Sequence, residues 1–363
     1  MSQRFQFSLR GLLPPSWRTI GEPIPRARFR LKMLLCVAAV LAILAQGVKI
    51  EIGRRTRARD ALEAEDALQR ARGGMALLSA EEIAALERDP RLPVLHRAAK
   101  NIASLHEKIR APGANDWLAK YHESGQTFGQ YLRSNPNRPS EHRTRFYLQP
   151  IGEFTAAERR TVEDTADLLS RFYSLPVELL DPLDLDLVPA LARRTHPRWG
   201  DEQVLTTYVL DDILMPRRPD DAVAVLALTT ADLWPGENNF VFGQASLTER
   251  VGVWSLYRYG DANGPESNDL FRRRLFKVAV HETGHMLGIM HCTAYECCMN
   301  GSNSLEELDS NPMWLCTECV QKVWWACSAD PAQRYQQLAD FAAKNHLDEE
   351  AVFWTRSGDC LNE

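Results

Sequence analysis

The run HETGHMLGIMH, residues 281–291, constrains this chain more than any other feature of its sequence. His281 and His285 are four residues apart, so a helix places both side chains on one face, one turn apart. Gly288 allows the sharp turn that ends such a helix, because glycine adopts a positive φ without steric cost. The turn brings His291 back toward the first two rings. Three neutral imidazoles that leave one position open for water are the ligand set of a catalytic zinc site.

Glu282 follows the first histidine and is the residue that we expect to carry the chemistry. Zinc in such a site lowers the pKa of its water to about 7 and polarises a carbonyl group. A carboxylate within reach of that water takes its proton as a general base and hands it to the leaving amine. The pattern H-E-x-x-H-x-x-G-x-x-H fixes five positions, which makes it far more specific than H-E-x-x-H alone. It therefore favours metal-assisted hydrolysis over an interpretation as surface histidines on an ordinary helix.

A second ligand set begins directly after the third histidine. Cys292, Cys297, Cys316 and Cys319 lie close together along the chain, and the last two form a C-x-x-C pair. Four thiolates at such spacing suit a closed structural site, so we predict two zinc ions, one catalytic and one structural. Cys298 is the alternative to Cys297 as a ligand. A disulfide framework is the other alternative, although disulfides are typically spread along small secreted chains.

The segments before this motif alternate between strands and helices. Apolar or alternating runs predict strands at 145–154, 177–180, 222–230, 238–247 and 251–259. Helical spacing and capping boxes predict helices after Thr155–Glu158, at 201–214 and at 269–289. This order predicts an α/β fold with a mixed, mostly parallel sheet and the histidine motif on a helix.

The N-terminal part carries a hydrophobic segment. Residues 1–32 are rich in Arg and Pro and are predicted to form a disordered basic arm. Residues 33–48 hold no charge and lie between Lys32 and Lys49, whose side chains could extend a span slightly shorter than the roughly 20 residues of a membrane helix. We predict a single-pass membrane anchor, whose orientation is weakly defined because basic residues flank it on both sides. A cleaved signal peptide, or a buried helix of a soluble cytoplasmic protein, are the alternatives.

The rest of the chain divides into three predicted parts. Residues 49–115 are rich in Ala, Glu and Arg and are expected to form a helical stalk or extension. Residues 116–327 are expected to form the catalytic domain with both zinc sites, and 328–363 to form packing helices. A chain of 363 residues with 45% hydrophobic composition can build such a core. The formal net charge of −5 does not suggest a nucleic-acid partner.

Taken together, these motifs resemble the archaemetzincins, zinc metallopeptidases of the metzincin clan. Their pattern joins the long histidine motif to four cysteines and a methionine, here Met299. NFVFGQASLTERVGVWSLYRY (239–259) and GSNSLEELD (301–309) are also similar to family segments, and the likeness runs from Glu123 to about Trp325. The family members lack an N-terminal hydrophobic segment, so the resemblance says nothing about the membrane anchor.

The resemblance implies a compact catalytic domain and a role for each matched residue. His281, His285 and His291 would hold the catalytic zinc, with Glu282 as general base and acid. The four cysteines would hold the structural zinc, and Cys297 is preferred because the next position is usually aliphatic in the family. Met299 would form the methionine turn beneath the histidines. The edge strand before the helix would pair with an extended substrate through its main chain, at Asn239, Phe240, Val241, Phe242 and Gly243.

We therefore predict a zinc-dependent metallopeptidase that hydrolyses peptide bonds in a peptide or protein substrate, with aminopeptidase-like trimming as one form of that activity. A non-catalytic, zinc-stabilised peptide-binding module is the alternative, and an amidase for non-peptide substrates is a third. Glu282 argues against the binding module, because a purely structural site has no use for that carboxylate.

Overall fold

The computed structural model describes residues 80–236, 239–246, 249–262 and 264–362, all within one compact unit. The predicted basic arm (1–32), the predicted membrane anchor (33–48) and residues 49–79 of the predicted extension lie outside the described residues. None of the helices in the described part of the chain combines the length and apolar character that crossing a bilayer requires.

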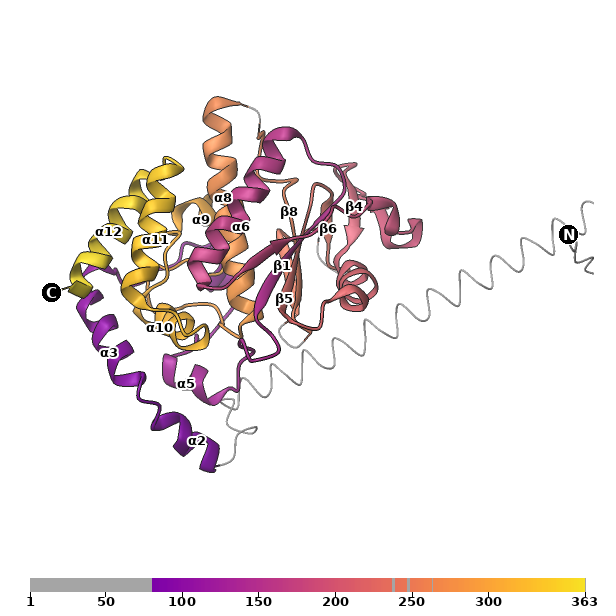
Figure 1. Cartoon of the computed structure of the whole chain (residues 1–363). Helices are drawn as coiled ribbons and strands as arrows, with labels where there is room; N and C mark the ends of the chain where they lie inside the picture. The colour runs from indigo at the N-terminus through magenta and orange to yellow at the C-terminus, as the bar shows by residue number, and fades with distance from the viewer. Residues whose placement is uncertain (1–79, 237–238, 247–248, 263, 363) are drawn as a thin grey trace, which may run out of the picture. The chain divides into compact units, whose positions relative to one another are not determined.

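A five-stranded sheet in the order β2-β1-β5-β8-β7 forms the centre of the fold (Figure 1). The first four strands are parallel and β7 pairs antiparallel with β8 at one edge. β5 is buried at every position, as its continuous apolar sequence predicts for a parallel strand covered on both faces. The predicted mixed, mostly parallel sheet is confirmed. The strand bounds are β1 Arg145–Ile151, β2 Val177–Leu179, β5 Ala222–Thr229, β7 Gly243–Ser246 and β8 Val251–Ser255.

Two long helices, α6 (Ala156–Tyr173) and α8 (Pro265–Met286), pack against each other beside this sheet (Figure 1). α6 begins at the predicted capping box, in which the Thr155 hydroxyl accepts from the Glu158 amide and the Glu158 carboxylate accepts from the Thr155 amide. α8 buries Leu275, Ala279 and Val280 completely and packs against β5, β7 and β8. The helix that carries the histidine motif is therefore fixed to the sheet edge.

A second, three-stranded sheet corrects one sequence prediction. Its order is β3 (Arg193–Thr195), β4 (Glu202–Leu205) and β6 (Asp232–Trp234). Residues 201–214 were predicted as one amphipathic helix, which is wrong for the first part: helix begins only at Thr206. The buried Gln203 amide donates to Asp232 of the neighbouring strand at 2.6 Å. This distant partner outweighs local helical spacing, since tertiary context overrides propensity.

Four helices from both ends of the described chain form a connected group: α3 (Leu92–Asn101), α10 (Thr317–Ala326), α11 (Pro331–Lys344) and α12 (Asp348–Asn362). α3 contacts α10 and α12, whereas α11 packs on α12 and α6. The two C-terminal helices occur where packing helices were predicted. α10 was not predicted, because the sequence argument used its first residues only as metal ligands.

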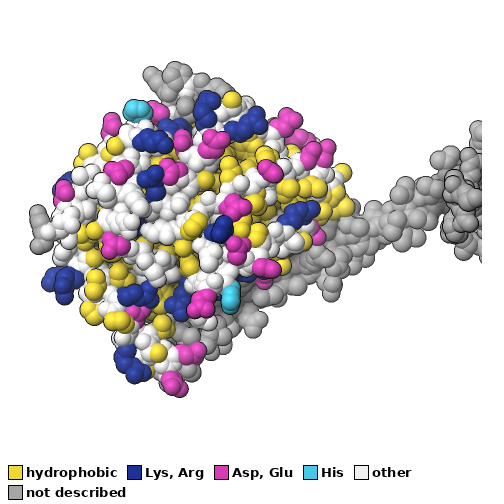
Figure 2. Space-filling model, viewed as in Figure 1, with side chains coloured by type: hydrophobic (Ala, Val, Ile, Leu, Met, Phe, Trp, Pro, Cys, Tyr) yellow, Lys and Arg dark blue, Asp and Glu magenta, His cyan; other side chains and the backbone are white. Residues whose placement is uncertain are grey.

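The remaining elements are short. They are α2 Ala80–Glu87, α4 Trp117–Lys120, α5 Phe128–Arg133, α7 Thr206–Tyr208, α9 Leu305–Ser310, the 3₁₀ helices η3 Ala103–Leu105, η4 Leu185–Leu187, η5 Ala190–Ala192 and η7 Met215–Arg217, and the π-helical segment η6 Val209–Leu214. On the face in Figure 2, acidic and basic side chains are interspersed.

Candidate metal and active site

The end of α8 presents the first two histidines and turns the chain back for the third. α8 ends at Met286, and Gly288 follows with a φ of 78°, in the region that favours glycine. A side chain here would also collide with the protein, since a Cβ would lie 3.0 Å from Pro136 Cβ. The Tyr131 hydroxyl donates to the Leu287 carbonyl at 2.8 Å and holds the turn. His291 thereby returns to the other two rings.

The three imidazoles converge on one point. Their ring centroids lie 4.5 Å (His281–His285), 4.9 Å (His285–His291) and 5.2 Å (His281–His291) apart. One nitrogen from each ring lies within 4.8 Å of the others, and the Nε2 atoms of His281 and His285 are 2.9 Å apart. Ligands at 2.0–2.1 Å around a tetrahedral zinc lie roughly 3.3 Å from one another. The donor set therefore fits a single zinc ion with little rearrangement.

Each ring is oriented through its Nδ1 atom. His281 Nδ1 lies 2.8 Å from the Cys298 carbonyl oxygen and His285 Nδ1 lies 2.7 Å from that of Ile289. His291 Nδ1 instead faces both carboxylate oxygens of Glu123, at 2.8 and 3.0 Å. Such acceptors hold a proton on Nδ1 and leave Nε2 free to bind metal. Burial, followed by the proximity of His291, lowers the pKa of His281 to about 3, so this ring is neutral.

Glu282 lies between the histidines and the sheet edge. A Cβ built on Gly243 of β7 would be 3.0 Å from Glu282 Oε1, so the carboxylate packs closely against that strand. Burial raises the pKa of Glu282 to about 8. A cation bound at the neighbouring histidines would lower that pKa, because opposite charge favours the ionised form. Glu282 is not one of the three converging donors. It lies next to them, where a general base would stand.

Met299 packs beneath the histidine helix. It is fully buried, and a Cβ on Gly284 would lie 2.6 Å from its sulfur. Its carbonyl accepts from the Cys292 amide at 2.7 Å, which ties the histidine turn to the cysteine loop. A larger residue than glycine at position 284 would therefore displace Met299.

The four predicted cysteine ligands form a second cluster. The sulfur atoms of Cys292, Cys297, Cys316 and Cys319 all lie within 4.8 Å of one another, and those of Cys292 and Cys316 are 3.6 Å apart. Thiolates around a tetrahedral zinc, at about 2.3 Å from it, lie roughly 3.8 Å from one another. The set fits a zinc ion, and the described cysteines are free rather than disulfide-bonded.

Backbone amides support this cluster and separate it from Cys298. The amides of Cys316 and Met299 lie 3.3 and 3.5 Å from Cys297 Sγ, as suits a thiolate acceptor. Cys298 Sγ faces the Lys277 carbonyl at 3.5 Å, and burial raises the pKa of this thiol to about 12. The structure therefore brings Cys297, not Cys298, into the cluster.

The predicted substrate-binding strand is shorter than expected. The sequence predicted a strand over 238–247, and among its described residues, 239–246, strand geometry covers Gly243–Ser246. Val241 pairs with Leu233 in a single bridge, and the Asn239 carbonyl accepts from Arg194 and Gln203. Phe240 packs edge-on against Phe242, with ring centroids 5.5 Å apart. Asn239 and Val241 are thus held by the second sheet. The Phe242 carbonyl accepts from the Ser255 amide of β8 at 2.8 Å, and the strand itself begins at Gly243.

Sequence reasoning missed two residues near the histidines. Glu123 is 168 positions from His291, and no local pattern could pair them. Tyr259 is 1% exposed, and its hydroxyl meets no hydrogen-bond partner among the described residues. Burial and, to a smaller extent, the charge of Glu282 raise the pKa of Tyr259 well above its usual value, so it stays protonated near the active site.

The chain is similar to known proteins. The model of peptidase family M54 matches residues 211–324, which contain every candidate ligand. Archaemetzincin-2 of Pongo abelii is 31% identical over 284 residues, covering 68% of this chain and 77% of the relative. Archaemetzincin of Archaeoglobus fulgidus is 32% identical over 179 residues, covering 49% of this chain and 98% of the relative. The crystal structure of the A. fulgidus protein complexed with malonate matches with 32% identity and a TM-score of 0.40, over 49% of this chain and 99% of that one.

Proposed function

This chain belongs to the archaemetzincin family and is a zinc metallopeptidase, and from this premise we propose that its reaction takes place at the cluster of His281, His285 and His291, with Glu282 as general base and acid. The observation that carries the proposal is the convergence of three imidazoles beside one carboxylate that is not itself a member of the cluster. The predicted binding module is not favoured, because the family is one of peptidases.

The residues of this chain divide the work as follows. The histidines would hold zinc, which when bound activates a water for attack and polarises the scissile carbonyl. Glu282 would take a proton from the attacking water and deliver it to the departing amine nitrogen. The outer edge of β7 would hold an extended peptide by main-chain hydrogen bonds. Because Gly243 of β7 lies next to Glu282, such a peptide would run past the base.

We propose a second zinc ion at Cys292, Cys297, Cys316 and Cys319, with a structural role. All four side chains are at least 95% buried, which leaves no open position for water. The site would fix the loop that follows His291 to the start of α10, and so hold the third histidine in place.

The test is digestion of a peptide library by the purified protein, with and without a chelator, alongside Glu282→Gln. We expect wild-type hydrolysis to stop on chelation and to return with zinc, and Glu282→Gln to bind the same amount of zinc without cleaving. Glu141→Gln is the matched control, because Glu141 is exposed. Full activity in Glu282→Gln would reject the assigned base. Two zinc ions with no cleavage of any peptide would favour the binding module.

Residues 33–48 remain a proposal from the sequence alone: we propose that they anchor the peptidase in a membrane. Fractionation of the full chain, with alkaline carbonate extraction, is the test. A protein that stays with the membrane pellet supports the anchor, and one in the supernatant contradicts it.

A further inference from the structure

The three histidines are not held alike. Neutral main-chain carbonyls from the same loop region hold His281 and His285. A carboxylate from a distant part of the chain holds His291 through both of its oxygens. The His291 side chain is 17% exposed and that of Glu123 is 29% exposed, so the pair is partly withdrawn from water. His291 is also the one ligand that is not carried by α8 and needs positioning from elsewhere.

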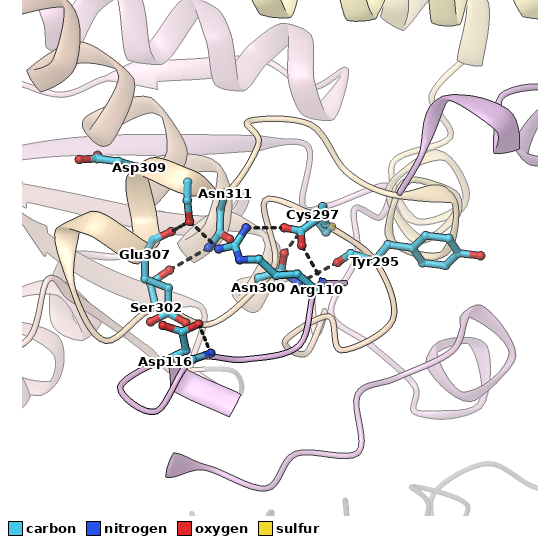
Figure 3. A network of polar contacts seen from close by, with 12 residues as sticks. Arg110, Asp116, Tyr295, Cys297, Asn300, Ser302, Glu307, Asp309 and Asn311 are labelled. Atoms are coloured by element: carbon cyan, nitrogen blue, oxygen red, sulfur yellow. Dashed lines mark hydrogen bonds and ion pairs between the residues drawn. The ribbon is translucent and has the colours of Figure 1, made fainter. Parts of the chain in front are cut away.

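Glu123 lies on a segment, residues 107–126, that crosses the metal-binding loop, and we call this segment the strap. Its first part adds a short antiparallel pairing to the loop: the Ile109 amide donates to the Ala294 carbonyl at 3.2 Å. Arg110 lies over the loop, where its backbone amide and guanidinium donate to Glu296 at 2.8 and 3.1 Å (Figure 3). The Lys108 ammonium sits 3.7 Å from the centre of the Tyr295 ring.

The second part of the strap contacts the histidine turn itself. The Trp117 amide donates to Glu307 at 2.8 Å, and its indole packs edge-on against His291, with ring centroids 5.0 Å apart. Gln126 donates to the Gly288 carbonyl and accepts from the Met290 amide, both at 3.3 Å. Glu123 lies between these two anchor points. The strap therefore contacts the histidine turn through Trp117 and Gln126, and the Glu123 carboxylate between them faces His291.

We propose that Glu123 is a positioning residue for the third zinc ligand. This inference rests on the proposed function, since it assumes that the histidine cluster binds zinc. The carboxylate accepts the Nδ1 proton of His291, which fixes the ring orientation and the tautomer that directs Nε2 at the metal. It also raises the basicity of Nε2. Loss of such a partner typically lowers metal affinity or activity 10- to 100-fold.

The experiment measures zinc affinity at the histidine site by competition with a chromogenic chelator, on the full chain with the cysteine site filled. Cobalt substitution distinguishes the sites, because only cobalt bound by cysteine shows thiolate-to-metal charge-transfer absorption. The variants are Glu123→Ala and Glu123→Gln. Arg110→Ala is the matched control, because it loosens the strap through Glu296 and leaves the carboxylate in place.

We expect Glu123→Ala to weaken zinc binding at the histidine site at least tenfold and to shift the cobalt bands of that site alone. Glu123→Gln should recover part of the loss, because its amide oxygen still accepts from Nδ1. Arg110→Ala should stay within twofold to threefold of wild type. Wild-type affinity in Glu123→Ala overturns the inference, and so does an equal loss in Arg110→Ala. If the wild-type histidine cluster binds no zinc at all, the proposed function fails instead.

Discussion

Substitution of Gly243 by alanine tests whether the Glu282 carboxylate packs directly against the edge strand β7. A Cβ at this position would lie 3.0 Å from Glu282 Oε1 and 3.0 Å from Trp254 Cβ. Ordinary van der Waals contacts begin at 3.4 Å, so each contact is short by 0.4 Å, the difference between 3.4 and 3.0. Trp254 is fully buried and its Cβ is fixed to β8, so relief of both contacts requires a shift of the β7 backbone as well as of the Glu282 carboxylate.

The size of the effect follows from this displacement. A misplacement of about 1 Å at a catalytic group can reduce the rate on the order of 100-fold. A shift of a few tenths of an ångström should then reduce kcat/KM about tenfold, which corresponds to about 1.4 kcal/mol in the barrier. Zinc content should not change, because the three atoms nearest to a Cβ at Gly243 belong to Glu282 and Trp254, which are not candidate ligands.

The assay is kcat/KM on a peptide chosen from the library digest, with zinc content measured on the same samples. Gly129→Ala is the matched control, because a Cβ at Gly129 meets nothing within 4 Å and the residue lies on the exposed side of α5. Activity within twofold of wild type in Gly243→Ala, with normal zinc content, would refute the placement of Glu282 against β7.

Three further predictions concern stability. Cys319→Ser should lower the zinc content by one ion per chain and destabilise the protein by several kcal/mol, because structural zinc sites contribute folding energy directly. Metal analysis measures the zinc content and thermal melting measures the stability. Cys360→Ser, at a partly exposed position, is the control and should change neither quantity. Burial lowers the pKa of His106 to about 4 from 6.5, so between these values the unfolded chain binds a proton that the folded chain does not. The free energy of unfolding should therefore fall as pH drops from 6.5 toward 4. His106→Leu should flatten this pH dependence in urea titrations, and equal slopes in the variant and the wild type would contradict it. Hydrogen bonds from Arg91 lower the pKa of Asp89 to about 2. The ionised carboxylate therefore stabilises the folded state above pH 3.8, and this stabilisation is lost as pH falls through 2. Asp89→Asn should lower the Tm at pH 7 and have little effect on it at pH 2.

Local rules account for what the sequence predicted correctly. The spacing of His281 and His285 and the position of Gly288 follow from helix and turn geometry, which depends on neighbouring residues alone. The apolar run of β5 and the capping box of α6 are likewise readable over a few residues. These features were enough to predict the sheet type and the helix that carries the histidines.

Features that depend on distant partners could not be predicted. β4 is a strand because Gln203 reaches Asp232 on another strand, although the local spacing is helical. Asn239 and Val241 are held by Arg194 and Leu233 of the second sheet, so the expected edge strand begins late. Glu123 acquires its role only when the strap folds over the turn of His291. Such contacts join residues far apart along the chain and leave no periodic signal in the sequence.

Anomalous diffraction at the zinc edge, from crystals of the purified protein, shows directly which side chains bind zinc. We expect one peak bonded to Nε2 of His281, His285 and His291, with Glu282 beside it and unligated. A second peak should lie among the sulfur atoms of Cys292, Cys297, Cys316 and Cys319. A zinc-saturated crystal with no peak among the three imidazoles, or with Glu282 as a ligand in place of one of them, would contradict this expectation.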